Sequence, residues 1–147
     1  MTYQLDPIGH VESMLTDRAQ APKQGREGAP EAWLVFRPEM AAALGNLAVG
    51  TDILVLTWLH QADRNVLAVH PRDNPKKPLT GVFSTRSADR PNPIGLHRVR
   101  IVAMQIPTSE NTAHAGFITG RPRIRVRDLE AVDGTPIVDV KPALSDR

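Results

Sequence analysis

Proline and glycine interrupt this chain so often that only short elements fit between them. The sequence holds 13 prolines and 10 glycines in 147 residues, which favours turns over long helices. Val, Ile and Leu dominate the apolar runs that remain, and β-branched residues favour strands. Aromatic residues make up only 4% of the chain, so aliphatic side chains must fill the core. These features predict one mainly β domain over residues 1–147, either a barrel or a strongly bent sheet.

The apolar runs predict eight or nine short strands and little helix. The most apolar run, ILVLTWLH at residues 53–60, is expected to form a strand that is buried on both faces. Pro38 and the helix formers of residues 39–44 predict one short helix or turn. The remaining strands are expected at residues 5–10, 32–36, 66–69, 82–83, 98–106, 115–119, 121–127 and 137–140.

The segment GVFSTRSADRPNPIGLH at residues 81–97 predicts a stiff loop between two strands. Its two prolines each fix a backbone φ angle, and the asparagine between them is biased towards an extended conformation. A rigid loop of this kind presents fixed polar groups to a ligand, here Arg86, Arg90 and Asn92. The alternative is a proline-rich crossover whose charged side chains are only solvated.

Positive charge is concentrated in the second part of the chain, although the net charge is only +2. Residues 1–63 carry 4 Lys/Arg and 8 Asp/Glu, giving −4, whereas residues 64–147 carry 14 Lys/Arg and 8 Asp/Glu, giving +6. Arginine supplies 14 of the 18 basic residues, and its planar guanidinium suits phosphate and carboxylate groups. The two explanations are an anionic partner, with nucleic acid as the first candidate, and ordinary solubilisation of the surface.

Several chemistries are excluded by what the sequence lacks. Without cysteine, the chain has no disulfide, thiolate zinc site or cysteine nucleophile. The patterns GxGxxG and GxxxxGK[ST] are missing, so loops must hold any nucleotide-like ligand. The five histidines show no HxH or HxxxH spacing, and we expect no metal site. No apolar run could span a bilayer and no signal pattern begins the chain, so we expect a cytoplasmic protein without membrane contact.

Three further features carry candidate chemistry, and each has a plainer alternative. His60 ends the most apolar run, either as a functional group or as a strand-end histidine bonded to a carbonyl. The arginines that alternate through residues 121–127 share one strand face, where they contact phosphates or protect an edge strand from pairing. Glu130 and Asp133 lie near a tight turn, where a carboxylate binds ribose hydroxyls or an ammonium group. In the plainer alternative, Asp133 bonds its own backbone.

The segment at residues 81–96 resembles the signature of the TsaA-like, or YaeB-type, family. These proteins are S-adenosylmethionine-dependent methyltransferases that methylate threonylcarbamoyl-adenosine in the tRNA anticodon loop. Shorter elements match in the family's order: Ile8-Gly9, Pro22-Lys23-Gln24, Leu59-His60-Gln61, Asp133-Gly134-Thr135-Pro136 and Val138-Asp139-Val140-Lys141-Pro142. Lys23 stands where the family's PRQ element has arginine. The resemblance covers essentially the whole chain and is to the short, single-domain form of the family.

The resemblance implies a small, partly open β-barrel of about eight short strands that acts as a homodimer. It implies that S-adenosylmethionine binds outside any Rossmann fold, near the subunit interface. Carried over by position, the cofactor contacts are Lys23, Gln24, His60, Gln61, Arg86, Leu96, Glu130, Ala131, Val132 and Asp133. The candidates for accepting a proton from the substrate are His60 and Asp133. The candidates for binding the substrate are Arg90, Asn92, Arg123 and Arg125. For Arg90 and Asn92 the alternative role is to shape the loop.

Three hypotheses about function follow from these features. The first is an S-adenosylmethionine-dependent methyltransferase that acts on tRNA. The second is a binding module that senses the cofactor without transferring its methyl group, because the sequence shows no obvious base. The third is a methyltransferase for another RNA or for a small molecule. Turnover with total tRNA separates the first hypothesis from the second.

Overall fold

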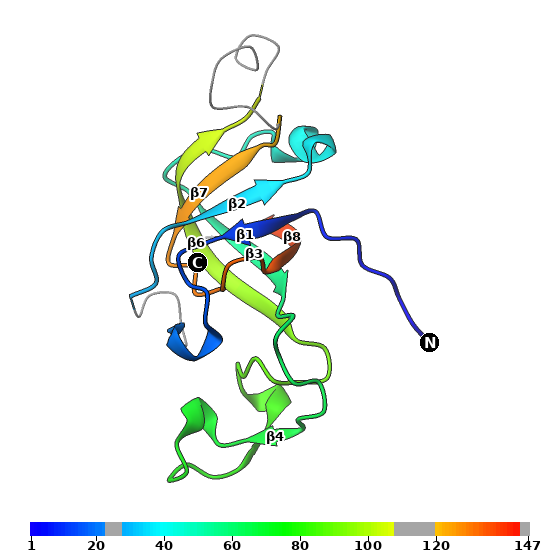
Figure 1. The fold of residues 1–147 in the computed structure, drawn as a ribbon, viewed down its shortest axis with the longest axis vertical. Coiled ribbons are helices and arrows are strands. Elements are labelled where there is room, and N and C mark those ends of the chain that lie inside the picture. The colour runs from blue at the N-terminus through cyan, green and yellow to red at the C-terminus, as the bar shows by residue number, and fades with distance from the viewer. Residues whose placement is uncertain (23–27, 108–119, 145–147) are drawn as a thin grey trace.

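The computed structural model describes residues 1–22, 28–107 and 120–144 (Figure 1). Six antiparallel strands close into a barrel in the order β1-β2-β7-β6-β3-β8. They are β1 (Gly9–Glu12), β2 (Ala32–Phe36), β3 (Asp52–Trp58), β6 (Ile94–Gln105), β7 (Arg123–Arg127) and β8 (Pro136–Pro142). A separate two-stranded sheet is formed by β4 (Ala68–Val69) and β5 (Thr80–Gly81).

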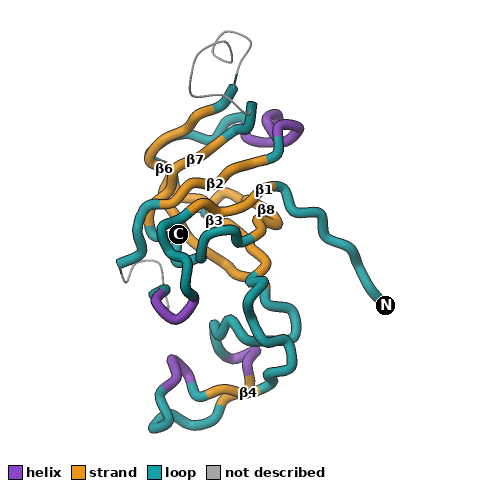
Figure 2. Tube along the Cα trace, viewed as in Figure 1, coloured by secondary structure: helices purple, strands orange, loops and turns teal. Residues whose placement is uncertain are grey.

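The helices in the described part of the chain are all short 3-10 segments (Figure 2). They are η1 (Arg18–Gln20), η3 (Pro38–Leu44), η4 (Pro71–Asp73) and η5 (Val82–Ser84). Pro38 begins η3, which confirms the short helix or turn expected at residues 38–44, and Pro71 likewise begins η4. The prediction of little helix is also confirmed for the described residues. None of these helices has the length and apolar character needed to cross a membrane.

Alternation along the strands places aliphatic side chains inside the barrel. Ile53 and Val55 of β3 and Val99 and Ile101 of β6 are buried, while their neighbours along each strand are more exposed. Phe36 is the one aromatic side chain among the buried core residues that the structure describes. The expectation of an aliphatic core is therefore confirmed.

The mainly β prediction is confirmed, and the structure corrects two details of the barrel. The sheet closes completely, because β1 pairs with β8 as well as with β2. Backbone hydrogen bonds from Ile8 N to Ile137 O and from Val11 N to Thr135 O, both 2.9 Å, extend this short seam. Six strands rather than about eight form the barrel, since β4 and β5 pair only with each other.

Some expected strands differ in extent or type from the observed ones. The strand expected at residues 5–10 begins only at Gly9, after the proline, and residues 82–83 belong to the 3-10 segment η5 instead of a strand. Only one face of β3 is fully buried, because a barrel strand has a single inner face. The strand expected at residues 115–119 lies outside the described residues.

The arginine-bearing strand β7 is not an edge strand, because it lies between β2 and β6. Its alternation is as expected, with Ile124 and Val126 fully buried and Arg123 and Arg125 on the outer face. Both guanidinium groups lie near the Trp33 ring, 4.2 and 5.6 Å from its centroid. Each also pairs with a glutamate, at 3.4 and 3.2 Å.

A long segment leaves the barrel after β3 and returns at the start of β6. We call residues 59–93 the excursion, and it carries β4, η4, β5 and η5. Because Trp58 pairs with Ile94, the excursion leaves and re-enters at the same end of the barrel (Figure 1). Leu59 N donates to Pro93 O at 2.8 Å and closes its base. The segment expected to be a stiff loop thus forms the returning part of a larger projection.

Candidate functional site

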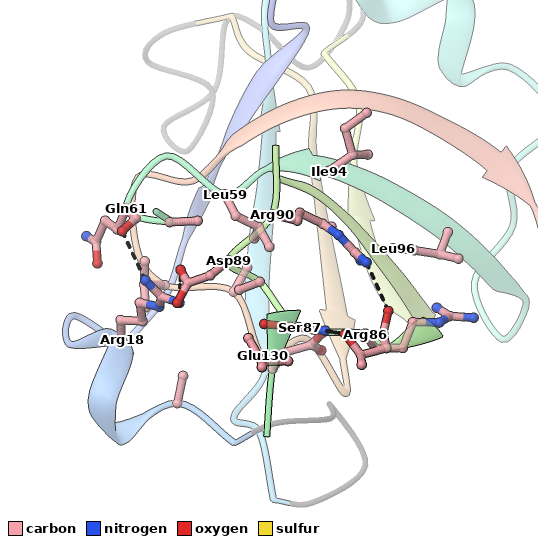
Figure 3. A pocket seen from close by; sticks show the side chains of 18 of the residues that line it. Arg18, Leu59, Gln61, Arg86, Ser87, Asp89, Arg90, Ile94, Leu96 and Glu130 are labelled. Atoms are coloured by element: carbon pink, nitrogen blue, oxygen red, sulfur yellow. Dashed lines mark hydrogen bonds and ion pairs between the residues drawn. The ribbon is translucent and has the colours of Figure 1, made fainter. Parts of the chain in front are cut away.

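A cleft of about 1000 Å³ lies between one end of the barrel and the excursion (Figure 3). The barrel contributes the start of β6 and the connection between β7 and β8. The excursion contributes residues from both of its limbs, and the segment around η1 completes the wall. Small-molecule sites commonly measure about 300–1,000 Å³. The cleft therefore has room for a cofactor-sized ligand and for part of a second molecule.

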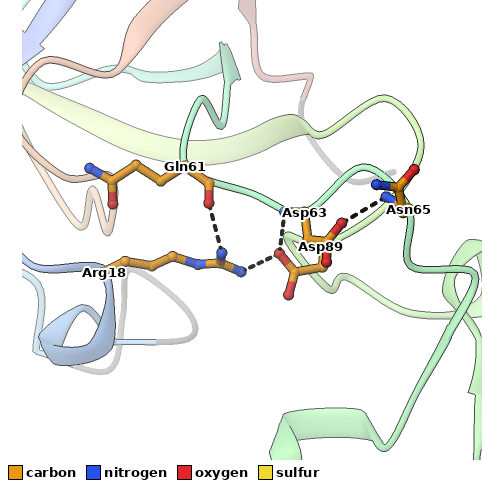
Figure 4. A network of polar contacts seen from close by, with 5 residues as sticks. All are labelled: Arg18, Gln61, Asp63, Asn65 and Asp89. Carbon is orange, nitrogen blue, oxygen red and sulfur yellow. Dashed lines mark hydrogen bonds and ion pairs between the residues drawn. The ribbon is translucent and has the colours of Figure 1, made fainter.

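Arg18 ties the segment around η1 to the excursion (Figure 4). Its guanidinium donates to Gln61 O at 3.1 Å and to Asp89 Oδ1 at 2.6 Å. The same carboxylate oxygen accepts from Asp63 N at 2.8 Å, and Asp63 in turn accepts from Asn65 N at 2.8 Å. Asp89 thus joins the two limbs of the excursion beside Gln61, at the cleft.

Arg90 and Asn92 are bonded within the excursion itself. The Arg90 guanidinium donates to Thr85 O at 3.0 Å and also to Val82 O. Asn92 Oδ1 accepts from Arg64 Nη2 at 2.8 Å. The carbonyl groups of Val82 and Thr85 lie outside the strands, and the Arg90 side chain donates to both of them. These bonds fix the returning limb.

Arg86 differs from these arginines in being exposed at the cleft without a protein partner. It forms no hydrogen bond or ion pair with any residue in the described ranges. In Figure 3 its guanidinium lies on the side of the cleft away from the Arg18 network. A guanidinium in this position can bind a carboxylate or phosphate through two parallel hydrogen bonds.

His97 lines the cleft although it is almost fully buried, and it forms hydrogen bonds with two other side chains. Its ring is only 4% exposed, with Nδ1 2.7 Å from Glu130 Oε1 and Nε2 2.7 Å from Thr57 Oγ1. Gly95 pairs with Thr57 across β3 and β6. A side chain at position 95 would collide with the Thr57 hydroxyl and come within 2.6 Å of His97 Nε2. The ring of His97 occupies the space that glycine leaves empty.

The cleft brings together many of the residues expected from the resemblance: His60, Gln61, Arg86, Arg90, Leu96, Glu130, Ala131 and Val132. Four expected residues do not line it: Asn92, Arg123, Arg125 and Asp133. The Asp133 carboxylate accepts from Ser13 N at 2.9 Å, rather than from its own backbone. Lys23 and Gln24 lie outside the described residues. No group of three or more potential metal ligands is found in the part of the chain that the structure describes.

Sequence reasoning missed Arg18, Asp89 and the role of His97. Arg18 and Asp89 are 71 positions apart, and no local pattern relates them. For His97 a signal was present, because it follows Gly95 and precedes Val99 at alternate positions. Strand alternation alone would have placed all three on the inner face of β6.

A family model described as the tRNA-methyltransferase O N-terminal domain matches residues 10–146. The chain belongs to this family. The expected resemblance to the TsaA-like proteins is therefore confirmed. Crystal structures of TrmO share the fold: that from Pseudomonas aeruginosa is 28% identical with a TM-score of 0.66, over 98% of this chain. This chain spans 57% of the length of that protein.

Two archaeal relatives of this TrmO-family chain match over most of their own length. One from Methanothermobacter thermautotrophicus, named a probable S-adenosyl-L-methionine-binding protein, is 40% identical over 99% of this chain and 93% of its own. Another, from Archaeoglobus fulgidus, is named an S-adenosyl-L-methionine-binding protein and is 36% identical over 93% of this chain and 86% of its own.

Proposed function

We propose that this protein is an S-adenosylmethionine-dependent methyltransferase that acts on tRNA, with threonylcarbamoyl-adenosine of the anticodon loop as its substrate. The cleft carries the proposal, because it gathers Arg86, Leu96 and Glu130 from separate parts of the chain. These are positions that the family resemblance connects with the cofactor. The names of the two archaeal relatives support the same ligand.

The residues of the cleft wall fit the chemical groups of the cofactor. Arg86 would bind the methionine carboxylate, and the Glu130 carboxylate would bind the ammonium group or the ribose hydroxyls. Ile94 and Leu96, 44% and 45% exposed at the cleft, would provide an apolar wall for the adenine ring. When bound, S-adenosylmethionine supplies an electrophilic methyl group. The protein's task is then to hold the substrate nitrogen in line with that group.

His60 is our candidate for accepting the proton that the substrate nitrogen loses when it is methylated. It is exposed and lines the cleft. Asp133, the other candidate, has its carboxylate bonded to the backbone of Ser13 outside the cleft. The N–H of the modified adenosine is acidified by its carbamoyl substituent, so a weak base such as neutral imidazole suffices.

Arg123 and Arg125 remain our proposed contacts for the tRNA backbone. They lie on the outer face of β7, and each already pairs with a glutamate, so phosphate must compete with that carboxylate. Changing both to Glu should weaken tRNA binding while leaving cofactor affinity unchanged, because neither residue lines the cleft. Full turnover of tRNA by this variant would exclude this face. Arg90 and Asn92 would meet the substrate only through the loop that they shape.

Methyl transfer to total tRNA tests the proposed reaction. The purified protein is incubated with S-adenosylmethionine and tRNA from a strain that lacks the gene, and the nucleosides are then analysed by mass spectrometry. We expect threonylcarbamoyl-adenosine to gain one methyl group. Unchanged tRNA nucleosides in the deletion strain itself would refute a role in tRNA modification.

A second candidate function is a module that binds S-adenosylmethionine without methyl transfer. The relatives' names favour it, because they mention binding only. Saturable cofactor binding with no transfer to any tRNA nucleoside would support this module against the enzyme. Transfer to a different RNA or to a small molecule would instead keep the reaction and replace the substrate.

We also propose that the protein acts as a homodimer in the cytoplasm, as the resemblance implies. Three large apolar side chains of the excursion, Leu67, Leu79 and Phe83, are 69%, 64% and 84% exposed. A second copy could cover them, since exposed apolar groups of this size are typical of interaction surfaces. Sedimentation analysis should give twice the mass of one chain, and a single-chain mass at working concentration would contradict the dimer.

A further inference from the structure

His97 connects the interior of the barrel with the wall of the cleft. Both ring nitrogens are bonded, Nδ1 to Glu130 and Nε2 to Thr57, each at 2.7 Å. An ionised carboxylate can only accept a hydrogen bond, so Nδ1 carries a proton. In the neutral ring, Nε2 then accepts the proton of the Thr57 hydroxyl. The ring is therefore fixed in one orientation and one tautomer.

A hydroxyl, an imidazole and a carboxylate that are hydrogen-bonded in this order occur in enzymes as a nucleophile, its base and the group that orients the base. In this protein, however, the hydroxyl is buried and the carboxylate is partly exposed. The hydroxyl-bearing Thr57 is 0% exposed and does not line the cleft. The Glu130 side chain is 19% exposed and does line it. A nucleophile must reach its substrate, so Thr57 is excluded from that role. The group that faces a ligand is the carboxylate.

The backbone on both sides of Glu130 is anchored in the core, with Leu129 0% and Ala131 4% exposed. The glutamate side chain still has three rotatable bonds, and ordering it costs free energy unless a partner holds it. Its bond to His97 engages one carboxylate oxygen. The other oxygen forms no hydrogen bond within the described residues and is left for a ligand.

We propose that His97 is a positioning residue for ligand binding: through Nδ1 it holds the Glu130 carboxylate so that Oε2 faces a cationic or hydroxyl-bearing group in the cleft. This inference rests on the proposed function, in which that group belongs to S-adenosylmethionine. Thr57 orients the ring from the opposite side, and Gly95 provides the space for their contact. The supporting side chains thus pre-organise the contact before the ligand arrives.

Two substitutions of His97 separate positioning from packing. In His97→Asn the amide nitrogen is attached to Cγ, as Nδ1 is, so it can still donate to Glu130. In His97→Gln the amide lies one bond further out and can reach Thr57 instead. Each variant keeps one of the two hydrogen bonds and loses the other, and thermal unfolding establishes the temperature at which both are folded.

Isothermal titration with S-adenosylmethionine then gives the decisive comparison. We expect His97→Asn to bind within about threefold of the wild-type affinity, and His97→Gln to bind about tenfold more weakly, as for one lost charge-assisted hydrogen bond. In a Glu130→Gln background, His97→Gln should cause no further loss, because its effect passes through the carboxylate. Equal losses in both His97 variants, or the same loss in both backgrounds, would overturn the proposal and leave His97 a packing residue.

Wild-type protein that binds no S-adenosylmethionine would contradict the proposed function, and a ligand-free measurement then decides the inference. The ¹⁵N resonances of the His97 ring report which nitrogen is protonated. We expect a protonated Nδ1 whose resonance shifts in Glu130→Gln. A ring protonated at Nε2 alone, or one that does not respond to Glu130→Gln, would overturn the positioning role.

Discussion

Among the described residues that line the cleft, Arg86 has its guanidinium available, because Arg18 and Arg90 are bonded to the excursion itself. Glu130 lines the same cleft, so Arg86 and Glu130 offer a ligand a cationic and an anionic group. A ligand with its own carboxylate and ammonium group matches both. We therefore expect these two residues to determine ligand affinity, and neither belongs to the barrel core.

Replacing Arg86 by Ala should weaken S-adenosylmethionine binding by about 10- to 100-fold, the cost of losing hydrogen bonds to a charged group. The unfolding temperature should stay unchanged, because this side chain is exposed and bonded to no described residue. Arg127→Ala is the matched control: it removes an exposed arginine that does not line the cleft. Equal affinities for both variants would mean that the carboxylate site lies elsewhere.

Gly95→Ala should destabilise the protein by about 2–4 kcal/mol, combining the strain of overpacking with a broken buried hydrogen bond. The added methyl group would collide with the Thr57 hydroxyl and press on the His97 ring. Gly81→Ala serves as control, since nothing lies within 4 Å of a side chain there. Urea unfolding of both variants measures the difference, and similar small effects would argue against a tight contact at position 95.

At the residue scale, the sequence predicted the cleft mainly through family resemblance. That resemblance selected Arg86, Leu96 and Glu130, all of which line it. Residue types alone could not rank the histidines, so His60 was preferred and His97 was missed. The difference is physical: a histidine's role depends on which partners surround the ring, and Thr57 and Glu130 come from distant positions.

At the scale of elements, the excursion is held by side chains rather than by strand pairing. Its only sheet joins β4 and β5 through two residue pairs. Arg64 closes the returning limb by donating to Pro91 O at 2.7 Å and to Asn92, and it also lies over the Trp58 ring. Such a segment can loosen locally while the barrel stays folded.

Asp89→Ala should loosen the excursion without unfolding the barrel. It removes the acceptor shared by Arg18 and Asp63 N. We expect faster hydrogen exchange at the Asp63 amide and a lower affinity for the cofactor in the cleft beside Gln61. The cooperative unfolding of the barrel should change little. Glu39→Ala, which removes a surface ion pair outside the excursion, should leave exchange there unchanged. Unaltered exchange at Asp63 in Asp89→Ala would show that Asp89 is not the link.

Asp52 illustrates a pH-dependent contact between β3 and β6. Hydrogen bonds from Arg100, and then Arg98, hold the pKa of its carboxyl below the ordinary value of 3.8. A lowered folded-state pKa stabilises the protein above the ordinary pKa, and this contribution disappears as pH falls through the lowered value. Asp52→Asn should therefore lower the melting temperature at pH 7 by about 1–3 °C, the range for surface ion pairs.

The pH profile of the same pair of proteins checks the sign. The difference in melting temperature between wild type and Asp52→Asn should persist from pH 7 down to about pH 5. It should shrink as the pH falls below the ordinary aspartate pKa of 3.8. A difference that grows on acidification would contradict the assignment. Arg98 and Arg100 lie 3.3 and 2.8 Å from the carboxylate, so high salt should reduce the difference.

Element prediction worked where a strand has a regular inner face and failed where side chains shape the backbone. Residues 32–36 coincide with β2, and the alternation of β7 is as expected. The segment at residues 82–83 has strand-like composition, but the Thr85 hydroxyl and amide both donate to Val82 O and tighten it into η5. Strand propensity alone does not predict a local turn that a side-chain hydrogen bond stabilises.

At the scale of the whole molecule, closure of the barrel explains where the cleft lies. A closed sheet has no free edge at which a ligand could bind, so binding groups gather at the ends of the strands and in their connections. The β3–β6 excursion and the β7–β8 connection meet at one such end, and both line the cleft. Composition predicted the mainly β class, but closure depended on the short β1–β8 seam, which no pattern in the sequence indicates.

We propose that this cleft binds S-adenosylmethionine, and isothermal titration of the wild-type protein decides whether it does. We expect saturable binding of one cofactor per chain, with S-adenosylhomocysteine competing for the same site. Absence of detectable binding at millimolar cofactor by a protein with a cooperative thermal unfolding transition would contradict the claim.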